Sequence, residues 1–312
     1  MPRALVTGGA GFIGSHLVDA LVQRGDAVLI VDNLITGKRE NVNPAAEFAE
    51  MDIRDPALTD LVARFRPEVV FHYAAQMDVR KSVADPLYDA DVNIRGLINL
   101  LEAASQAGTE QVVFASSGGT VYGEADVLPT DESAPLKPES PYGVSKLSSE
   151  FYLGYYAKAK GLSCVCLRYG NVYGPRQDPH GEAGVVAIFT TRLLDGERCR
   201  IFGDGEQTRD YVNVADVAAA NMAALERRPD GITQINIGTS VATSVNALHA
   251  HLAEFTGGDP EVIREPAREG ELQHSALAAG RALAMLGWRP ETDLREGLRR
   301  YVAYVRERRA AR

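Results

Sequence analysis

Three glycines spaced three residues apart constrain the fold of this chain most strongly. Ala4–Thr7 is a short apolar run, Gly8, Gly11 and Gly14 follow it, and Phe12–Arg24 carries apolar residues at helical spacing. In a strand, glycine turn and helix of this kind, a pyrophosphate can approach the helix N-terminus, where backbone N–H groups point outward. The sequence therefore predicts a dinucleotide-binding unit at its start.

An acidic residue follows the next predicted strand and indicates which dinucleotide binds. Ala27–Val31 is apolar, and Asp32 comes directly after it, 18 residues beyond Gly14. A carboxylate at this place accepts hydrogen bonds from an adenosine ribose and repels a 2′-phosphate, so we expect NAD rather than NADP. Lys38 and Arg39 lie nearby in the sequence and argue in the other direction.

Strand-like and helix-like segments alternate through the first half of the chain. Val69–Tyr73, Gln111–Ser116 and Ser163–Arg168 repeat the strand pattern, and Tyr88–Gln106 is a long helical pattern. Such alternation implies a mainly parallel sheet with helices on both faces. We therefore expect an α/β protein with a Rossmann-type, doubly wound parallel sheet.

The pattern changes after about residue 170, which indicates a second domain. Loops rich in Gly and Pro at 174–184, 203–205 and 264–270 separate shorter elements there. We expect a smaller α/β domain that is interleaved with the first. In this division residues 1–169 plus roughly 210–238 form the dinucleotide-binding domain, and 170–209 plus 239–312 form the second domain.

Composition excludes several kinds of partner. The formal net charge of −9 argues against nucleic acid or an anionic membrane surface as the main partner. No run of about 18 apolar residues is present to span a membrane. Cys164, Cys166 and Cys199 have neither a disulfide framework nor a metal-binding spacing. We therefore expect buried thiols, no metal site and a cytoplasmic protein.

Two tyrosine–lysine pairs have a spacing of four residues, which places both side chains of a pair on one face of a helix. They are Tyr142 with Lys146 and Tyr156 with Lys160. A neighbouring ammonium group stabilises a phenolate and lowers the tyrosine pKa, which makes a base usable near neutral pH. A Ser-Pro helix start precedes Tyr142 and places it near the sheet edge where cofactors bind. We therefore predict Tyr142 as the base and a structural role for Tyr156.

Motifs along nearly the whole chain resemble one known family. They are TGGAGFIGSHL at 7–17, VDNL at 31–34, HYAAQ at 72–76, SSGGTVYGE at 116–124, SPYGVSK at 140–146, LRYGNVYGPR at 167–176, IFGDGEQTRDYVNVADV at 201–217, REGEL at 268–272 and LGWRP at 286–290. By this resemblance the chain is identified as a member of the extended short-chain dehydrogenases/reductases. Within them it is similar to the NAD-dependent epimerase/dehydratase group, and there to the UDP-glucose (UDP-galactose) 4-epimerases.

The resemblance implies a role for each residue that matches a family position. It implies that Tyr142 is the catalytic base and that Lys146 is its partner. The implied contacts to NAD come from Gly8, Gly11, Phe12, Ile13, Gly14, Asp32, Asn33, Asp52, Ile53, Tyr73, Ala74, Ala75, Gln76, Asn93, Ser116, Tyr142, Lys146 and Tyr169. The implied contacts to a nucleotide-sugar substrate come from Ser117, Asn171, Arg200, Phe202, Arg209, Arg268 and Glu271.

The chain departs from the family pattern at the third catalytic position. The family has Ser or Thr five residues before the glycine of VYG, and this chain has Gly118. Ser117 or Thr120 could supply the missing hydroxyl, and the sequence does not decide between them. Gly119 and Thr120 stand where a 4,6-dehydratase has its Asp-Glu acid/base pair, so that reaction is not expected.

The resemblance implies a UDP-hexose 4-epimerase that interconverts UDP-galactose and UDP-glucose by transient oxidation at carbon 4 with tightly bound NAD. Ser275 stands where narrow-specificity epimerases have a tyrosine, so UDP-GlcNAc and UDP-GalNAc are further candidate substrates. A UDP-glucuronate epimerase or another nucleotide-sugar oxidoreductase is the alternative within the family. A non-catalytic NAD(H)-sensing protein is the alternative of another class. The family also implies a homodimer built from the helices around 88–106 and 142–159.

Overall fold

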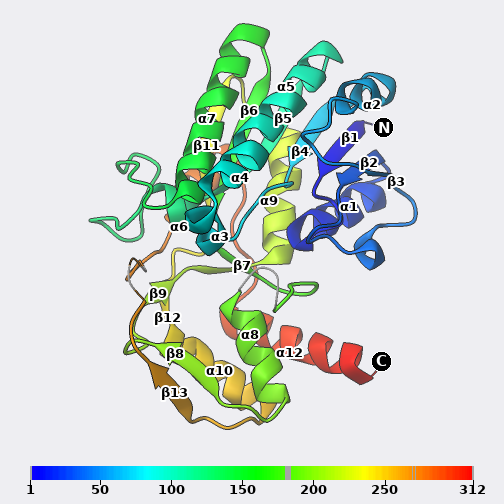
Figure 1. The fold of residues 1–312 in the computed structure, drawn as a ribbon. Helices are drawn as coiled ribbons and strands as arrows, with labels where there is room; N and C mark the ends of the chain where they lie inside the picture. The colour runs from blue at the N-terminus through cyan, green and yellow to red at the C-terminus, as the bar shows by residue number, and fades with distance from the viewer. Residues whose placement is uncertain (1, 180–183, 269, 271, 311–312) are drawn as a thin grey trace.

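A seven-stranded sheet, in which every neighbouring pair is parallel, forms the centre of the fold (Figure 1). The computed structural model describes residues 2–179, 184–268, 270 and 272–310. The strand order is β11-β6-β5-β4-β1-β2-β3. The strands are β1 (Arg3–Thr7), β2 (Ala27–Asp32), β3 (Glu47–Glu50), β4 (Val69–His72), β5 (Gln111–Ser117), β6 (Ser163–Tyr169) and β11 (Ile232–Ile237). The expected Rossmann-type sheet is thereby confirmed.

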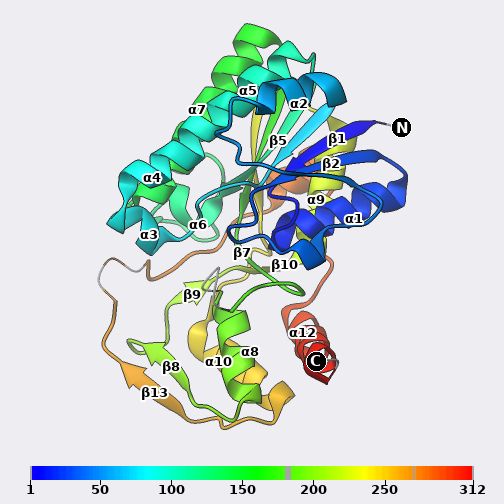
Figure 2. The ribbon, with the colours of Figure 1, turned by 45° about the vertical axis from the view of Figure 1, so that its right-hand side comes forward.

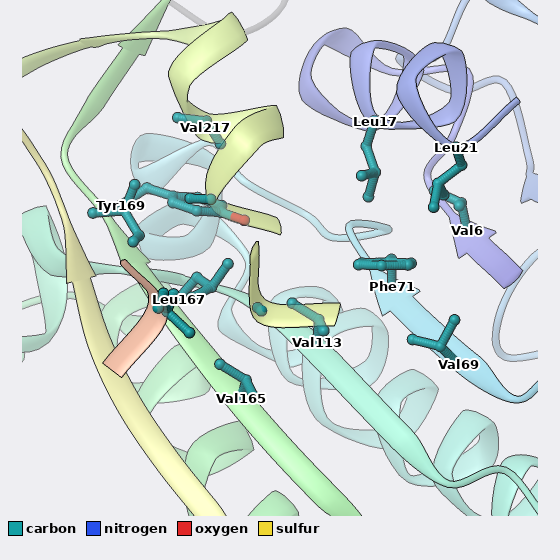
Figure 3. Close-up of a cluster of buried hydrophobic side chains, with 14 of the residues drawn as sticks. Val6, Leu17, Leu21, Val69, Phe71, Val113, Val165, Leu167, Tyr169 and Val217 are labelled. Atoms are coloured by element: carbon teal, nitrogen blue, oxygen red, sulfur yellow. The ribbon is translucent and has the colours of Figure 1, made fainter. Parts of the chain in front are cut away.

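Helices cover both faces of this sheet because side chains alternate between its faces along each strand. Phe71 and Val113 pack on the face covered by α1 (Phe12–Arg24), α9 (Val214–Arg227) and α11 (Gly280–Leu286), part of which Figure 3 shows. Val70 and Val112 pack on the opposite face, which is covered by α2 (Leu58–Phe65), α5 (Gly96–Gln106) and α7 (Pro141–Lys160).

The long helical pattern predicted at 88–106 forms a helical run that begins two residues earlier. α4 (Pro86–Ala90) continues through a π-helical turn at Asp91–Arg95 into α5. Three further short helical segments complete this part of the chain: a 3₁₀ turn (Arg39–Asn41), α3 (Val79–Ala84) and α6 (Gly118–Val121). Single π-helical turns inside helices often mark functional sites, and this turn lies behind the site described below.

A smaller α/β body with its own apolar core lies below the sheet in Figures 1 and 2. Its helices are α8 (Val185–Leu194), α10 (Val245–Thr256) and α12 (Leu294–Ala310). Its strand pairs are β8 (Cys199–Phe202) with β13 (Val262–Glu265), and β9 (Thr208–Arg209) with β12 (Thr243–Ser244). β7 (Asn171–Tyr173) pairs with β10 (Tyr211–Asn213) between the two bodies.

The chain crosses between the two bodies more often than the predicted boundaries state. Ala282, Leu286 and Trp288 pack with α1 and α9 against the large sheet, although the expected division assigns 239–312 to the second domain. The indole Nε1 of Trp288 also donates a hydrogen bond to the carbonyl of Asp216, at 2.9 Å. α11 therefore packs as a helix of the large sheet.

The cysteines are free and buried, as expected. Cys164 and Cys166 lie in β6, and Cys199 lies in β8. Burial raises the pKa of the Cys164 thiol to about 12 and that of Cys199 to about 11. In the described part of the chain, no helix combines the length and the apolar character that crossing a membrane requires.

Candidate active site

Two adjoining cavities open at the carboxyl edge of the sheet, where ligands bind in doubly wound folds. The first has a volume of about 270 Å³ and lies over the turns that follow β1, β2 and β4. The second has a volume of about 540 Å³ and lies between the ends of β5 and β6 and the smaller body. Phe12, Ile13 and Met77 line both, so the two cavities are neighbouring compartments of one cleft.

The glycine turn after β1 forms one wall of the first cavity and leaves no room for side chains. Gly8 has a φ of +72°, and a Cβ atom there would lie 2.6 Å from the backbone nitrogen of Ala74. A Cβ atom on Gly14 would lie 2.3 Å from the Gly8 carbonyl oxygen. Gly11 caps α1 without a side-chain hydrogen bond, so the first-turn N–H groups face the cavity uncovered by any side chain. This cradle fits a diphosphate.

Asp32 lies at the end of β2 and lines the first cavity with a nearly buried carboxylate. It accepts hydrogen bonds from the backbone N–H groups of Ala10 at 3.0 Å and Leu34 at 2.9 Å, while burial raises its pKa. The two nearby cations interact with other groups. Lys38 pairs with Asp178 at 2.6 Å, and the Arg39 guanidinium lies 4.3 Å from the centre of the Phe48 ring. The carboxylate of Asp32 in the cavity and the engagement of Lys38 and Arg39 elsewhere both favour binding of a ribose without a 2′-phosphate.

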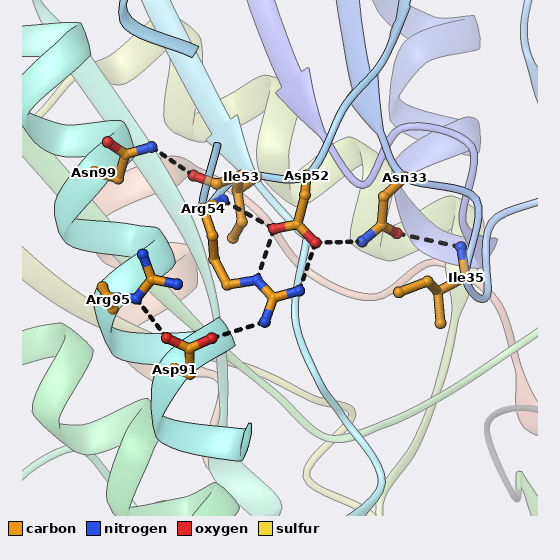
Figure 4. Close-up of polar contacts among 8 residues, drawn as sticks. All are labelled: Asn33, Ile35, Asp52, Ile53, Arg54, Asp91, Arg95 and Asn99. Atoms are coloured by element: carbon orange, nitrogen blue, oxygen red, sulfur yellow. Dashed lines mark hydrogen bonds and ion pairs between the residues drawn. The ribbon is translucent and has the colours of Figure 1, made fainter. Parts of the chain in front are cut away.

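An ion-pair network fixes the far end of the first cavity (Figure 4). The carboxylate of Asp52 accepts bonds from Nε and Nη2 of Arg54, both at 2.8 Å, and from the amide of Asn33 at 2.9 Å. Arg54 also bonds Asp91 of the π-helical turn, at 2.7 Å. These partners hold the pKa of Asp52 well below its usual range, so Asp52 is ionised where it and Ile53 line the cavity.

Asn93 lies behind the first cavity and lines neither compartment. Its side-chain amide donates to the carbonyl of Gln76 at 2.8 Å and accepts from the Gln76 N–H at 2.9 Å. The buried carboxylate of Asp89 bonds both side chains. Gln76 itself lines the cavity together with Tyr73, Ala74 and Ala75. Within the protein, Asn93 therefore holds the cavity-lining segment in place.

Tyr142 and Lys146 lie together at the start of α7. Ser140 caps this helix by accepting a bond from the Gly143 N–H at 3.1 Å, and Tyr142 lines the second cavity. The ammonium of Lys146 donates to the Ala115 carbonyl at 2.8 Å and lies 5.6 Å from the centre of the Tyr142 ring. Burial lowers the pKa of Lys146 to about 8, although nearby carboxylates oppose this shift.

Tyr156 has the structural role expected for it. Tyr156 lies on α7, and its ring is buried in the core that α5 and α7 form against the sheet. Its hydroxyl donates to Glu102, and the residue lines neither cavity. Burial and the Glu102 carboxylate raise its pKa, which makes it a poor base. The environment therefore separates Tyr142 from Tyr156, which have the same spacing to a lysine.

Two tyrosines connect the compartments. The hydroxyl groups of Tyr73 and Tyr169 are 3.1 Å apart, and their rings stack with centres 6.5 Å apart. Tyr73 lines the first cavity and Tyr169 lines the second. Burial raises the pKa of Tyr169 to about 12, so this phenol stays protonated and offers a flat wall rather than a base.

The candidate hydroxyl groups near Gly118 differ in their positions. Ser117 lines the second cavity with Tyr142. The Oγ1 atom of Thr120 is buried without a hydrogen-bond partner among the described residues, and Thr120 lines neither cavity. Ser116 also lines the second cavity, but its hydroxyl donates to Glu150 at 2.6 Å, and Glu150 pairs with Arg168. Ser117 therefore lines the cavity with Tyr142, whereas the Ser116 hydroxyl is bonded to Glu150 and Thr120 lies outside both cavities.

Four arginines and no acidic residue belong to the described lining of the second cavity. They are Arg192, Arg200, Arg209 and Arg268. Asn171 and Phe202 also line it, and the Arg268 guanidinium lies 3.7 Å from the centre of the Phe202 ring. Glu271 lies outside the described residues. Arg192 pairs with Glu197 and Arg200 pairs with Glu265, both at 3.1 Å. The lining nevertheless carries only positive side-chain charge in a chain with a net charge of −9, so this cavity is suited to an anionic ligand.

Sequence reasoning did not identify Met77 and Arg192 as lining residues. Arg192 lies on α8, and its Nε donates to the carbonyl of Arg198 at 3.0 Å. Its local sequence is that of any solvated arginine, so only the position of α8 against the sheet reveals it. Ser275 is not among the lining residues, and its N–H donates to the Thr208 carbonyl at 3.2 Å. In the described part of the chain, no cluster of three or more His, Cys, Asp or Glu side chains could hold a metal ion.

Comparison with known proteins identifies the family. Residues 4–238 match the profile of the NAD dependent epimerase/dehydratase family. This chain belongs to that family. The putative UDP-glucose 4-epimerase of Methanocaldococcus jannaschii is 49% identical over 97% of this chain and 98% of its own length. The UDP-glucose 4-epimerase of Mycolicibacterium smegmatis is 47% identical over 98% of this chain and 99% of its own length.

Solved structures support the same assignment. The UDP-glucose 4-epimerase of Thermotoga maritima, solved with UDP-glucose, is 49% identical with a TM-score of 0.96, covering 98% of this chain and 99% of that one. The Thermus thermophilus UDP-glucose 4-epimerase in complex with NAD is 47% identical with a TM-score of 0.92, covering 97% and 99%. The UDP-N-acetylglucosamine 4-epimerase of Methanobrevibacter ruminantium is 35% identical with a TM-score of 0.92, covering 98% and 99%. NAD is therefore the cofactor of this enzyme, and the glycine cradle and Asp32 of the first cavity fit it.

Proposed function

We propose that this chain is a UDP-hexose 4-epimerase that interconverts UDP-galactose and UDP-glucose with resident NAD. The observation that carries the proposal is the position of Tyr142 and Lys146 in the cleft. Tyr142 lines a cavity that holds four arginines and adjoins a second cavity with a diphosphate cradle. Relatives that match nearly the full chain carry the same activity in their names.

The first cavity would hold the adenosine and diphosphate parts of NAD, and the nicotinamide end would extend into the second cavity, which Ser116, Tyr142 and Tyr169 line. The glycine turn and α1 would take the pyrophosphate, Asp32 and Asn33 the adenosine ribose, and Asp52 and Ile53 the adenine. The other proposed contacts are the Tyr73–Gln76 segment, Asn93 from behind it, Ser116, Tyr142, Lys146 and Tyr169. When bound, NAD supplies reversible oxidation and reduction at carbon 4 of the sugar.

Proton movement at the sugar 4-hydroxyl is the proposed task of Tyr142. The phenolate takes the proton in one half-reaction and returns it in the other. The Lys146 ammonium stabilises that phenolate through its charge, because it lies close to the ring in a buried site. Ser117, which faces the same cavity, hydrogen-bonds the sugar 4-oxygen.

The arginine-lined cavity would hold the nucleotide while the hexose turns over. Arg209, Arg268 and Asn171 bind the diphosphate, because an arginine fork matches its oxygen pairs. Arg200 and Phe202 contact the uridine, as does Glu271. A tight grip on the nucleotide keeps the 4-keto sugar in the cleft, so the sugar can present its other face before reduction.

Substrates with a 2-acetamido group belong to the same proposal. The small Ser275 and the similarity to a UDP-N-acetylglucosamine 4-epimerase support turnover of UDP-GlcNAc and UDP-GalNAc. Ser275 lies outside the lining of the second cavity, so any effect of its size would act through the neighbouring backbone. Absence of UDP-GlcNAc turnover in an enzyme that converts UDP-galactose would remove this part of the proposal.

The proposed assembly is a homodimer formed by the helical run of α4 and α5 together with α7. Leu87, Phe151 and Tyr155 are 83%, 70% and 61% exposed on these helices. Apolar side chains gathered on neighbouring helices are typical of a protein interface. The buried, free thiols support a cytoplasmic location. We propose the same domain division except that α11 (Gly280–Leu286), which packs with α1 and α9, belongs to the NAD-binding domain.

Turnover without added cofactor tests the proposal. Purified protein is incubated with UDP-galactose and no NAD, UDP-glucose is assayed, and the denatured protein is analysed for released NAD. The proposal predicts conversion and released NAD close to one per chain. Stoichiometric oxidation of added NADH, with a product other than UDP-glucose, would indicate a net reductase instead. Turnover of UDP-glucuronate alone would favour the glucuronate epimerase, and bound NAD without turnover of any UDP-sugar would favour the NAD(H) sensor.

A further inference from the structure

Gly118, where the family has a hydroxyl residue, is packed against a leucine from a distant part of the chain. A Cβ atom on Gly118 would lie 2.5 Å from Cδ1 and 2.8 Å from Cδ2 of Leu277. Leu277 is 1% exposed and packs with Val121 and Tyr122 in a small apolar cluster. The leucine therefore has little space into which it could retreat, and only glycine leaves room for it.

Leu277 belongs to a segment, residues 272–279, that is hydrogen-bonded on both sides. Thr130 donates its N–H to the Ala276 carbonyl and accepts from the Ala278 N–H, both at 2.8 Å. On the other side, the Ser240 hydroxyl donates to the Leu277 carbonyl at 3.0 Å. Leu277 is the central residue of this pairing, and its side chain is the one that meets Gly118 of α6.

The same segment is bonded to the strand that carries Arg209. Thr208 donates its N–H to the Gln273 carbonyl at 2.8 Å and accepts from the Ser275 N–H at 3.2 Å. Asp210 is 1% exposed and accepts a bond from the Leu277 N–H at 3.1 Å. Arg209 lies between these two anchors, and Arg268 lies four residues before the segment begins.

We propose that Gly118 is a positioning residue whose missing side chain forms the socket for Leu277. The contact sets the distance between Ser117, on the catalytic side of the cleft, and the 272–279 segment. Through that segment it sets the position of Arg209, which lies between the two anchors at Thr208 and Asp210. The glycine thus serves nucleotide binding, and Ser117 serves the hydroxyl role that the family gives to position 118. This inference deepens the proposed function and rests on the second cavity being the UDP site.

The matched pair Gly118→Ala and Gly119→Ala tests the socket. Gly119 is the next residue of α6, and a Cβ atom there meets nothing within 4 Å. The probe is UDP alone, measured by calorimetry, with kcat and KM for UDP-galactose beside it. We expect Gly118→Ala to raise the UDP Kd and KM roughly tenfold with a smaller change in kcat, as overpacking displaces the segment. Gly119→Ala should bind UDP like the wild type.

Leu277→Ala completes a double-mutant cycle. The cycle distinguishes a specific loss of UDP binding in Gly118→Ala from a loss caused by misfolding of that variant. On its own, Leu277→Ala should weaken UDP binding, because it leaves the socket empty without crowding. In the double variant Gly118→Ala/Leu277→Ala, the methyl group added at position 118 fits into the space that the leucine side chain has left. Its UDP affinity should therefore equal that of Leu277→Ala alone. Additive losses, or equal UDP affinity for Gly118→Ala and Gly119→Ala, would overturn the inference. So would a higher kcat in Gly118→Ser, which would make position 118 a vacant hydroxyl site.

The outcomes separate this inference from the function on which it rests. A wild-type protein that binds UDP, loses this affinity in Gly118→Ala, but converts no UDP-hexose would overturn the epimerase proposal and keep the socket. A wild-type protein that converts UDP-galactose, with equal UDP affinity in the two alanine variants, would keep the epimerase proposal and overturn the socket. A wild-type protein without affinity for UDP would overturn both.

Discussion

Tyr142 and Tyr156 show how environment selects one of two equal sequence matches. Both have a lysine four residues later on the same helix. Tyr142 lines the arginine-rich cavity beside the Lys146 ammonium, whereas Tyr156 is buried against Glu102, whose carboxylate opposes ionisation. The positive charge of Lys146 favours the phenolate of Tyr142, and the negative charge of Glu102 disfavours that of Tyr156. This difference decides which tyrosine can act as a base.

The two phenylalanine variants should differ sharply. Tyr142→Phe removes the base, so kcat for UDP-galactose should fall by about three orders of magnitude. Tyr156→Phe removes only a hydrogen bond to Glu102, so it should lower the melting temperature slightly and keep kcat. Steady-state assays and thermal denaturation measure both. Equal losses of kcat in the two variants would contradict the assignment of the base.

Lys146 should give the pH profile an alkaline limb. Its pKa is lowered to about 8 by burial, and the ammonium that stabilises the phenolate is present below this pH and lost above it. Activity should therefore fall as the pH rises through about 8. Lys146→Met should abolish the activity. Lys160→Met, in the second tyrosine–lysine pair, should keep both the activity and its fall above about pH 8. A kcat/KM that stays constant from pH 7 to pH 10 would be inconsistent with this role.

Ser117 and Thr120 should also separate by substitution. Ser117→Ala removes the hydroxyl of a residue that lines the cavity with Tyr142, so kcat should fall by roughly one to two orders of magnitude. Thr120→Val replaces a buried hydroxyl that has no partner among the described residues, so kcat and stability should be kept. Measured kcat values in the reverse order would place the catalytic hydroxyl at Thr120.

At the scale of elements, local patterns predicted most of what the structure contains. The apolar spacing of Phe12–Arg24 gives α1 its observed bounds, and the Ser-Pro helix start gives α7 its N-terminus. Long-range pairs carry no local signal. The Glu150–Arg168 pair, at 2.6 Å, and the Leu277–Gly118 contact join segments whose own sequences give no hint of a partner. Arg192 enters the cavity only because α8 packs where it does.

The exposed apolar face of α7 should control assembly. Phe151 is 70% exposed, and Phe151→Glu would place a charge in the proposed dimer interface, so the variant should be monomeric in light scattering. Leu283 on α11 is 56% exposed and lies outside the proposed interface, so Leu283→Glu is the matched control and should stay dimeric. A wild-type monomer, or a Phe151→Glu variant that remains dimeric, would argue against this interface.

At the scale of the whole molecule, two bodies enclose one cleft with a clear division of charge. The chain carries a net charge of −9, yet the described lining of the second cavity contains four arginines and no carboxylate. The sequence indicates three of these arginines, Arg200, Arg209 and Arg268, one motif at a time, and only the packing of the two bodies adds Arg192 and brings the four together. In the proposed binding mode, the nucleotide is held at one end of the cleft while the reacting carbon lies beside Tyr142.

The central claim is that carbon 4 is oxidised and then reduced without exchange with solvent. UDP-galactose carrying deuterium at carbon 4 tests it directly, with NMR or mass spectrometry of the UDP-glucose formed. The account predicts that the product retains deuterium at carbon 4 and that turnover of the labelled substrate is no faster than that of the unlabelled one. Loss of the deuterium to water would contradict it, since this would mean proton abstraction from carbon rather than transient oxidation in a closed cleft.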